Sequence, residues 1–154
     1  MKKILIAVDD TKATSEIFSK CVQLCKCMAP EEIQLLYVEK FEGRTLMDEM
    51  LGDAELSTLK EVLEGTEYME ALDQKAEKIL QHYKKMLEEN SPTPLVKTIV
   101  KTGHPAEEIL KTAKEEAPDI IFVGSKGKRI SSLLVGSVSR EVVNLAECPV
   151  VVVK

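Results

Sequence analysis

Short apolar segments alternate along this chain with longer amphipathic segments, and this alternation restricts the possible folds more than any other feature. The apolar segments have the length and the β-branched content of buried strands, and they cover residues 3–8, 33–38, 95–101, 119–123 and 150–153. Between them, apolar residues recur at the three- and four-residue spacing of one helix face. Strands that alternate with helices predict a mostly parallel sheet with helices on both faces, joined by right-handed crossovers. The sequence therefore predicts an open α/β domain.

Four helices are predicted from apolar stripes that would face the sheet. The first contains Ile17, Phe18, Cys21, Leu24, Cys25 and Met28, with Thr11 or Thr14 as its cap. A long second stripe contains Met69, Leu72, Ala76, Ile79, Leu80, Tyr83, Met86 and Leu87. The helix that begins at Pro105 would bury Ile109, Leu110, Ala113 and Ala117. The last would bury Val138, Val142, Leu145 and Ala146.

A connection at about residues 41–66 interrupts this regular order. It contains three glycines and two short amphipathic pieces, the second formed by Leu56, Leu59, Val62 and Leu63. We expect these pieces to cover an edge of the sheet, and a lid or a dimer element is the alternative. With 154 residues and no linker, we expect residues 1–154 to form a single domain.

Composition and charge exclude several classes of function. A net charge of −5 argues against nucleic acid as a partner, since such binding needs clustered Lys and Arg. No apolar run has the length of a membrane span, and Asp9 and Asp10 interrupt the only stretch that could begin a signal peptide. The four cysteines lack zinc-ligand spacing, so we expect reduced, mostly buried thiols. These features indicate a cytoplasmic protein that binds neither membrane nor nucleic acid.

The segment from Gly124 to Ser139 has the features of a phosphate site. Gly124 and Gly127 follow a predicted strand and allow close approach of the backbone to a ligand. A helix then begins near Gly136, where free N–H groups and the helix dipole favour an anion. Further donors and positive charge come from Lys126, Ser137, Val138 and Ser139 and from the neighbouring Lys128 and Arg129. The alternative is that Ser137 only caps its helix and that the glycines only satisfy turn geometry.

Known nucleotide motifs of other kinds are absent. The chain contains no G-x-x-x-x-G-K-[ST] sequence, and no glycine follows the first predicted strand as a dinucleotide-binding G-x-G-x-x-G would require. A receiver domain would need a phosphoacceptor aspartate after its third strand and a lysine after its fifth. Asp53 lies in a helical stretch and Lys154 ends the chain, so neither fits.

The motifs that are present resemble those of the universal stress protein family. They are I-L-I-A-V-D at residues 4–9, L-L-Y-V at 35–38, V-x-x-G-x-P at 100–105, and G-S-K-G at 124–127 followed by L-V-G-S-V at 134–138 and C-P-V at 148–150. The resemblance implies an open five-stranded parallel sheet in the order 3-2-1-4-5, with helices on both faces, of the adenine nucleotide alpha hydrolase-like type. It also implies a homodimer with the final strand, residues 150–153, near its interface.

The same resemblance implies an adenine nucleotide, ATP, ADP or AMP, with or without Mg²⁺, as the ligand. Adenosine would lie against Ala7, Val8, Asp9 and Val38. The ribose and phosphates would be held by Gly127, Gly136, Ser137, Val138 and Ser139.

One departure from the family pattern leaves two functions open. Nucleotide-binding members have nine residues between the second and third glycines, whereas eight residues, 128–135, separate Gly127 from Gly136. The first function is a regulatory nucleotide-binding protein with at most slow ATP hydrolysis, and the alternative is a dimeric stress-response scaffold that has lost the ligand. No residue is assigned a catalytic role, because neither His82 nor His104 lies in a catalytic pattern.

Overall fold

The computed structural model describes residues 2–39, 52–90, 95–125 and 135–154. The elements follow in the order β1 (Lys3–Val8), α1 (Lys12–Met28), β2 (Glu32–Glu39), α2 (Asp53–Leu63), α3 (Glu67–Asn90), β3 (Leu95–Thr102), α4 (Pro105–Glu116), β4 (Ile120–Gly124), α5 (Ser137–Leu145) and β5 (Val150–Val153). This is the order of strands and helices that the apolar pattern predicts.

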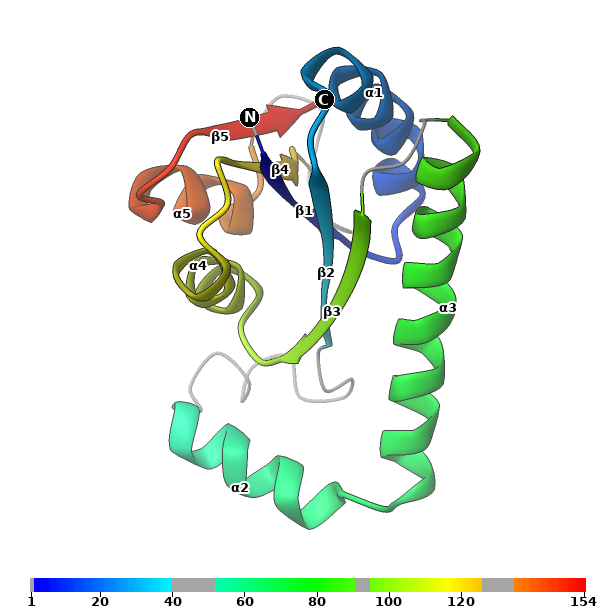
Figure 1. Cartoon of the computed structure of the whole chain (residues 1–154). Helices are drawn as coiled ribbons and strands as arrows, with labels where there is room; N and C mark the ends of the chain where they lie inside the picture. The colour runs from blue at the N-terminus through cyan, green and yellow to red at the C-terminus, as the bar shows by residue number, and fades with distance from the viewer. Residues whose placement is uncertain (1, 40–51, 91–94, 126–134) are drawn as a thin grey trace.

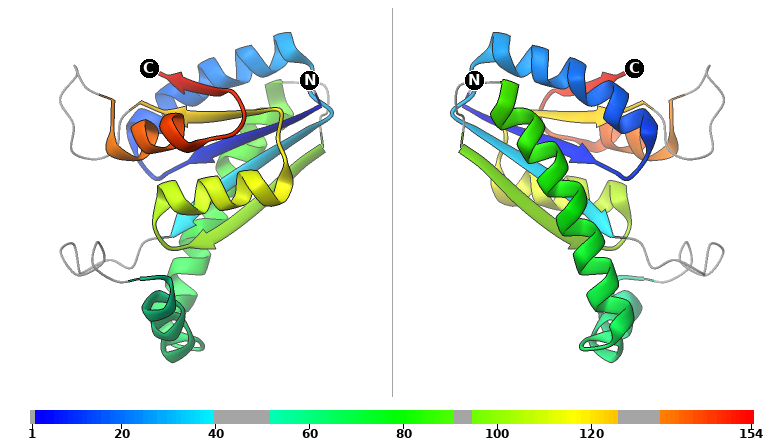
Figure 2. Two further views of the ribbon diagram at one scale, coloured as in Figure 1. Left: turned by 90° about the vertical axis from the view of Figure 1, so that its left-hand side faces the viewer. Right: turned by 90° about the vertical axis from the view of Figure 1, so that its right-hand side faces the viewer.

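The strands form one parallel sheet in the order β3-β2-β1-β4-β5, which confirms the expected topology. Helices α1 and α3 cover one face of the sheet, and α4 and α5 cover the other (Figures 1 and 2). β1, β2 and β4 are the most buried strands because each has a neighbour on both sides and helices above and below. The edge strand β3 contains only exposed and half-buried residues and no buried one, as expected for an edge.

The hydrophobic core lies in two layers, one on each face of the sheet. The layer beneath α1 and α3 contains Ile4, Ile6, Val8, Phe18, Leu35 and Tyr83, among others. The layer beneath α4 and α5 contains Leu5, Leu36, Ile109, Ile121 and Val142, among others. Successive residues of a strand point to opposite faces, so the continuous apolar runs of β1 and β2 supply both layers.

The helix ends follow from their terminal residues. Thr11 is the N-cap of α1, where its hydroxyl oxygen accepts from the Thr14 N–H at 3.2 Å, as predicted. α1 and α4 end at Ala29 and Ala117, which adopt left-handed φ angles of 43° and 47°. Pro105 occupies the first turn of α4, where its missing N–H costs nothing.

Three of the predicted core positions are wrong. Leu24 is 42% exposed and Leu145 is 59% exposed. Ala117 is exposed and lies beyond the end of α4, because its left-handed conformation ends the helix. The buried positions that complete these faces are Val22 in α1 and Ala106 and Thr112 in α4. The error has a common cause, since a stripe read by spacing alone does not define how wide the covered face is.

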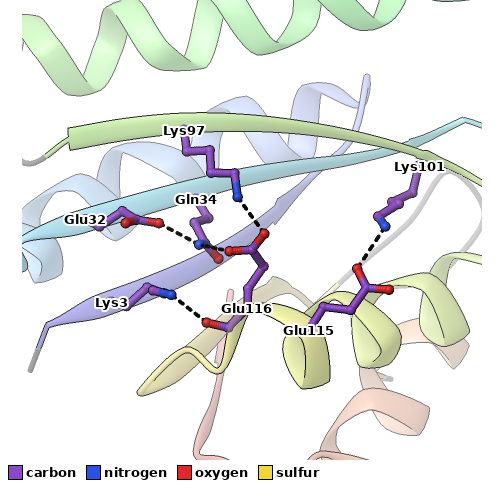
Figure 3. Close-up of polar contacts among 7 residues, drawn as sticks. All are labelled: Lys3, Glu32, Gln34, Lys97, Lys101, Glu115 and Glu116. Atoms are coloured by element: carbon purple, nitrogen blue, oxygen red, sulfur yellow. Dashed lines mark hydrogen bonds and ion pairs between the residues drawn. The ribbon is translucent and has the colours of Figure 1, made fainter.

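A network of polar side chains joins the amino ends of the strands to the end of α4 (Figure 3). Gln34 is fully buried in β2, and its Nε2 donates to Glu32 Oε1 at 2.6 Å and to Glu116 Oε2 at 2.8 Å. Lys97 Nζ donates to Glu116 Oε1 at 2.5 Å, and Lys3 Nζ donates to the Glu116 carbonyl at 2.6 Å. The network lies at the amino ends of the strands, so it does not contribute to a site at their carboxyl ends.

The expected covering of a sheet edge by the 41–66 connection is not what the structure shows. Leu95 and Val100 of the edge strand β3 remain 67% and 43% exposed. α2 lies beyond that side of the sheet, at the amino end of α3 (Figures 1 and 2). The first amphipathic piece, which consists of Leu46, Met47, Met50 and Leu51, lies outside the described part of the chain. Among the residues that are described, no helix is both long and apolar enough to cross a membrane.

Candidate functional site

The order of the strands reverses between β1 and β4, and the candidate site lies at the carboxyl ends of these two strands. From β1 the chain proceeds to β2 and β3 on one side, then crosses to β4 and β5 on the other. In open α/β sheets, the crevice at such a reversal is the usual place for a ligand. Asp9 directly follows β1, and Gly124 ends β4. Because β1 and β4 pair in parallel, these two residues lie at the same edge of the sheet.

The Asp9 carboxylate is held by the residues that begin α1. Its Oδ1 accepts from the Thr11 N–H at 2.9 Å, from the Thr11 hydroxyl at 2.7 Å and from the Thr14 hydroxyl. Three donors on one oxygen fix the orientation of the carboxylate. No hydrogen bond to the second oxygen, Oδ2, is found within the described residues. Oδ2 is therefore an oriented acceptor on a half-buried side chain.

Helix α3 holds the main chain of the same loop. The Tyr83 hydroxyl donates to the Asp9 carbonyl at 3.2 Å, and Lys75 Nζ pairs with Asp10 Oδ2 at 2.9 Å. Burial, together with the nearby Asp9 and Asp10 carboxylates, raises the pKa of Tyr83 to about 12. The phenol therefore stays protonated at neutral pH and remains a donor. Its ring packs against Phe18 with 4.5 Å between the ring centroids, which fixes its position.

The first turn of α5 lacks a side-chain cap. Its N-cap residue is Gly136, which has no side chain to accept from the N–H groups of that turn. Unpaired N–H groups and the positive end of the helix dipole together favour an anion at this position. Gly136 is buried and has φ −60° and ψ 158°, angles that any residue can adopt. What glycine contributes here is therefore the missing Cβ and not a special backbone conformation.

Two hydrogen bonds hold the end of β4 beside the start of α5, and a third joins it to β5. The Ser139 hydroxyl donates to the Gly124 carbonyl at 2.5 Å, and the Gly136 N–H donates to the Ser125 carbonyl at 2.8 Å. The Ser125 N–H in turn donates to the Val153 carbonyl at 2.8 Å. The two ends of the glycine-containing segment are thus fixed relative to each other and to β5.

The apolar residues predicted for the site divide between the two faces of the sheet. Ala7, Val38 and Val138 are half-buried and all pack against the core layer beneath α4 and α5. The side chain of Val8 packs in the layer beneath α1 and α3, on the opposite face of the sheet from the other three. Only the main chain of Val8 is therefore available to a ligand on the face that the other three share. The structure therefore brings Ala7, Val38 and Val138 to one face.

The remaining predicted residues differ in exposure. Ser137 is exposed on the first turn of α5, whereas Ser139 is buried and its hydroxyl proton is used by Gly124. Lys126 and Gly127 lie outside the described residues.

Two features of the site were not identified from the sequence. Thr11 and Thr14 were considered only as helix caps, although their spacing after Asp9 is that of hydroxyls that turn back to a carboxylate. Tyr83 has no local signal, because it reaches Asp9 from a helix 74 residues farther along the chain.

A buried carboxyl at the end of β2 also lies outside the predicted set. Glu39 is 2% exposed, its Oε2 accepts from the Thr102 hydroxyl at 3.0 Å, and its Oε1 has no partner among the described residues. Burial is the main cause that raises the pKa of this carboxyl. The described side chains contain no group of three or more His, Cys, Asp or Glu residues arranged to hold a metal ion.

The reversed strand order defines a doubly wound α/β protein, and the anion-favouring start of α5 makes the switch point its candidate ligand site. The universal stress protein family model matches residues 1–154, and the chain belongs to this family. A universal stress protein of Methanocaldococcus jannaschii is 37% identical over 157 residues, which cover 99% of this chain and 94% of that protein.

Solved structures share the fold along the whole chain. The universal stress protein UspA from Lactobacillus plantarum has a TM-score of 0.74 and 24% identity, covering 99% of this chain and 97% of that one. A universal stress protein family protein from Arabidopsis thaliana with AMP bound has a TM-score of 0.65 and 20% identity, covering 100% and 92%. The universal stress protein from Archaeoglobus fulgidus in complex with dAMP has a TM-score of 0.56 and 16% identity, covering 100% and 98%.

Proposed function

We propose that this protein binds an adenine nucleotide, ATP, ADP or AMP, at the carboxyl ends of β1, β2 and β4. The observation that carries this proposal is the first turn of α5, which lacks a side-chain cap and lies at the same sheet edge as the oriented carboxylate of Asp9. The AMP and dAMP complexes of proteins with the same fold support an adenine nucleotide as the ligand.

The phosphates would lie at the start of α5. The main-chain N–H groups of Ser137 and Val138 would donate to phosphate oxygens, together with Gly124, Lys126 and Gly127 from the preceding segment. The Gly136 N–H is taken by the Ser125 carbonyl, so Gly136 would contribute only the space left by its missing Cβ. Ser139 would act indirectly, since its hydroxyl holds the Gly124 carbonyl.

The adenosine would lie between β1 and β2. Oδ2 of Asp9 would accept a hydrogen bond from a ribose hydroxyl or from the adenine amino group. Ala7, Val38 and Val138 would supply apolar contacts from the face that they share. Val8 would contribute its main chain only.

The function would be regulatory, with at most slow ATP hydrolysis. Efficient hydrolysis needs a positioned water, a base and stabilisation of the transition-state charge. The two carboxylates that follow β1 are both engaged, Asp9 with Thr11 and Thr14 and Asp10 with Lys75. Mg²⁺, where present, would be held through the phosphates.

Two measurements on the purified protein test nucleotide binding. Small molecules released by denaturation are identified by mass spectrometry, and calorimetry is carried out with AMP, ADP and ATP in the presence and absence of Mg²⁺. We expect a co-purifying or titratable adenine nucleotide at one site per chain. The proposal would be refuted if the protein released no nucleotide and if none of the three nucleotides gave heat.

A dimeric scaffold without a ligand is the second candidate. The observation that favours it is the segment between Gly127 and Gly136, which is one residue shorter than in nucleotide-binding members. Calorimetry with AMP and ATP distinguishes the two candidates, because a scaffold without a ligand site gives no heat. The scaffold would still have the mass of a dimer in sedimentation.

We also propose that a single domain forms a homodimer through β5. β5 pairs with β4 on one side, and no strand within the described residues pairs with its other side. Val150, Val151 and Val152 remain half-buried along this edge. We expect a dimer mass in sedimentation, with hydrogen exchange at β5 that quickens on dilution; a monomer at all concentrations contradicts this arrangement.

We expect the protein in the cytoplasm, which cell fractionation would test.

A further inference from the structure

Helix α2 and the start of α3 form an acidic projection that the nucleotide site does not use. We call residues 53–74, which comprise α2, the turn after it and the first part of α3, the arm. The arm contains seven acidic residues and one basic residue, a net charge of −6, whereas the whole chain has a net charge of −5. The rest of the chain is therefore nearly neutral, and the negative charge of the protein is concentrated in this element.

The shape of the arm presents this charge to solvent. α2 stands beyond the β3 side of the domain, joined to it through α3 (Figures 1 and 2). Glu55, Glu61, Glu64, Glu67 and Glu70 are all exposed. The single cation of the arm, Lys60, is exposed as well. The outward charge of the arm is therefore almost entirely negative.

Apolar side chains interrupt the acidic surface of α2. Val62 is 71% exposed, and Leu59 and Leu63, three residues before it and one after it, are only half-buried. Residues 59, 62 and 63 have the spacing of one helix face. Val62, Leu59 and Leu63 thus form a small contiguous apolar group among charged residues, and contiguous apolar patches with a polar rim occur where another protein binds.

We propose that the arm is a docking surface for a basic amphipathic helix of another protein. Such a helix matches both features, because its apolar face would cover Val62 with Leu59 and Leu63 while its lysines or arginines would meet the surrounding glutamates. A second copy of this chain is a poor occupant, because two arms of −6 each repel one another.

The probe is a labelled synthetic peptide of leucine and lysine that forms a basic amphipathic helix, titrated with the full chain by fluorescence anisotropy near physiological ionic strength. A peptide of the same composition in scrambled order has the same charge without an apolar face. We expect the amphipathic peptide to bind and the scrambled peptide to bind roughly ten-fold or more weakly, because Val62 and its neighbours contribute only to the first.

The double variant Glu61→Lys/Glu64→Lys replaces two negative charges of the arm by two positive charges without disturbing its helix. Both residues are exposed in or just after the last turn of α2, where a basic residue suits the helix dipole. Glu88→Lys/Glu89→Lys is the matched control at the far end of α3, where both side chains are exposed and form only surface pairs with Lys84 and Lys85. We expect roughly ten-fold weaker peptide binding for the first variant and little change for the second.

Val62→Ser tests the apolar contact in the same assay. Its matched control is Val143→Ser on α5, where the valine is 47% exposed. We expect weaker binding for Val62→Ser alone. Equal losses in either matched pair, equal binding of the scrambled peptide, or no binding of the amphipathic peptide would overturn the proposal. Self-association of the native chain that Glu61→Lys/Glu64→Lys abolishes would also overturn it, in favour of a second copy as the occupant.

Discussion

Replacing Asp9 by asparagine separates the structural role of this carboxylate, which accepts from Thr11 and Thr14, from its proposed role as a ligand acceptor. Oδ1 accepts from three donors of Thr11 and Thr14, so the amide oxygen of an asparagine must occupy that position. The amide nitrogen is then forced into the position of Oδ2. A donor then replaces the acceptor that the proposed function assigns to the ligand, and a ligand group bonded to Oδ2 would lose its partner.

The expected magnitudes of the two effects differ. A donor left without a partner in a partly buried site costs about 1–3 kcal/mol, which corresponds to about 5- to 150-fold weaker nucleotide binding. The fold loses only the charge on an oxygen that keeps its three donors, so we expect a cost of about 1 kcal/mol, or a fall in Tm of about 2–4 °C. Calorimetry with AMP measures the first effect, and thermal unfolding followed by circular dichroism measures the second.

Asp10→Asn is the matched control for Asp9→Asn. It removes the same charge one residue away, where the carboxylate pairs with Lys75 at 2.9 Å. Loss of a negative charge near an anionic ligand favours binding in both variants. Only Asp9→Asn should therefore weaken binding. AMP affinity that is unchanged or tighter in Asp9→Asn would refute the assignment of Oδ2 as a ligand acceptor.

Three further predictions concern other parts of the chain. Gly136→Val should abolish nucleotide binding by calorimetry with little change in Tm, because φ −60° suits valine and only the added side chain obstructs the phosphates; a variant that unfolds would show that this glycine is structural. Glu39→Gln should raise Tm near neutral pH, because the raised pKa of the Glu39 carboxyl means that the folded state binds its proton more tightly than the unfolded state does, so that stability falls as pH rises through the folded pKa. The gain should vanish on acidification below the ordinary carboxyl pKa of about 4, and a gain that persists there would contradict this cause. A thiol reagent should modify the exposed Cys27 first and leave Cys21 and Cys25 unmodified in the folded protein, because burial raises their pKa values to about 12 and about 11; rapid modification of either, located by peptide mass mapping, would contradict their burial.

Most of the fold was predictable because its signals are local. The bounds of β1 and β5 agree with the apolar runs at 3–8 and 150–153, and the other strands differ from their predicted ranges by one or two residues. The strand order came from the family resemblance, since periodicity does not specify which strands become neighbours. The width of each buried helix face was less predictable, because spacing alone does not show how much of a helix is covered, and Leu24 and Leu145 are exposed.

The site divides in the same way between local sequence and tertiary structure. Sequence alone places Asp9 and Gly124 at the ends of strands and Gly136 at the start of a helix, and these positions make them candidates for the site. The side of the sheet that each residue faces follows from strand alternation once β1 is located, which separates Ala7 from Val8.

Contacts between distant segments were decided only by the tertiary structure. Tyr83 reaches the Asp9 carbonyl across 74 residues, and the Ser139 hydroxyl holds the Gly124 carbonyl instead of remaining free for a phosphate. The position of the arm beyond the β3 side of the sheet was likewise decided by the tertiary structure, although the charge of the arm is evident in the sequence. Sequence by itself determined which chemical groups stand at the ends of strands and helices, because those positions depend on local periodicity. Packing decided which groups meet, because a hydrogen bond between elements depends on how the whole sheet and its helices assemble.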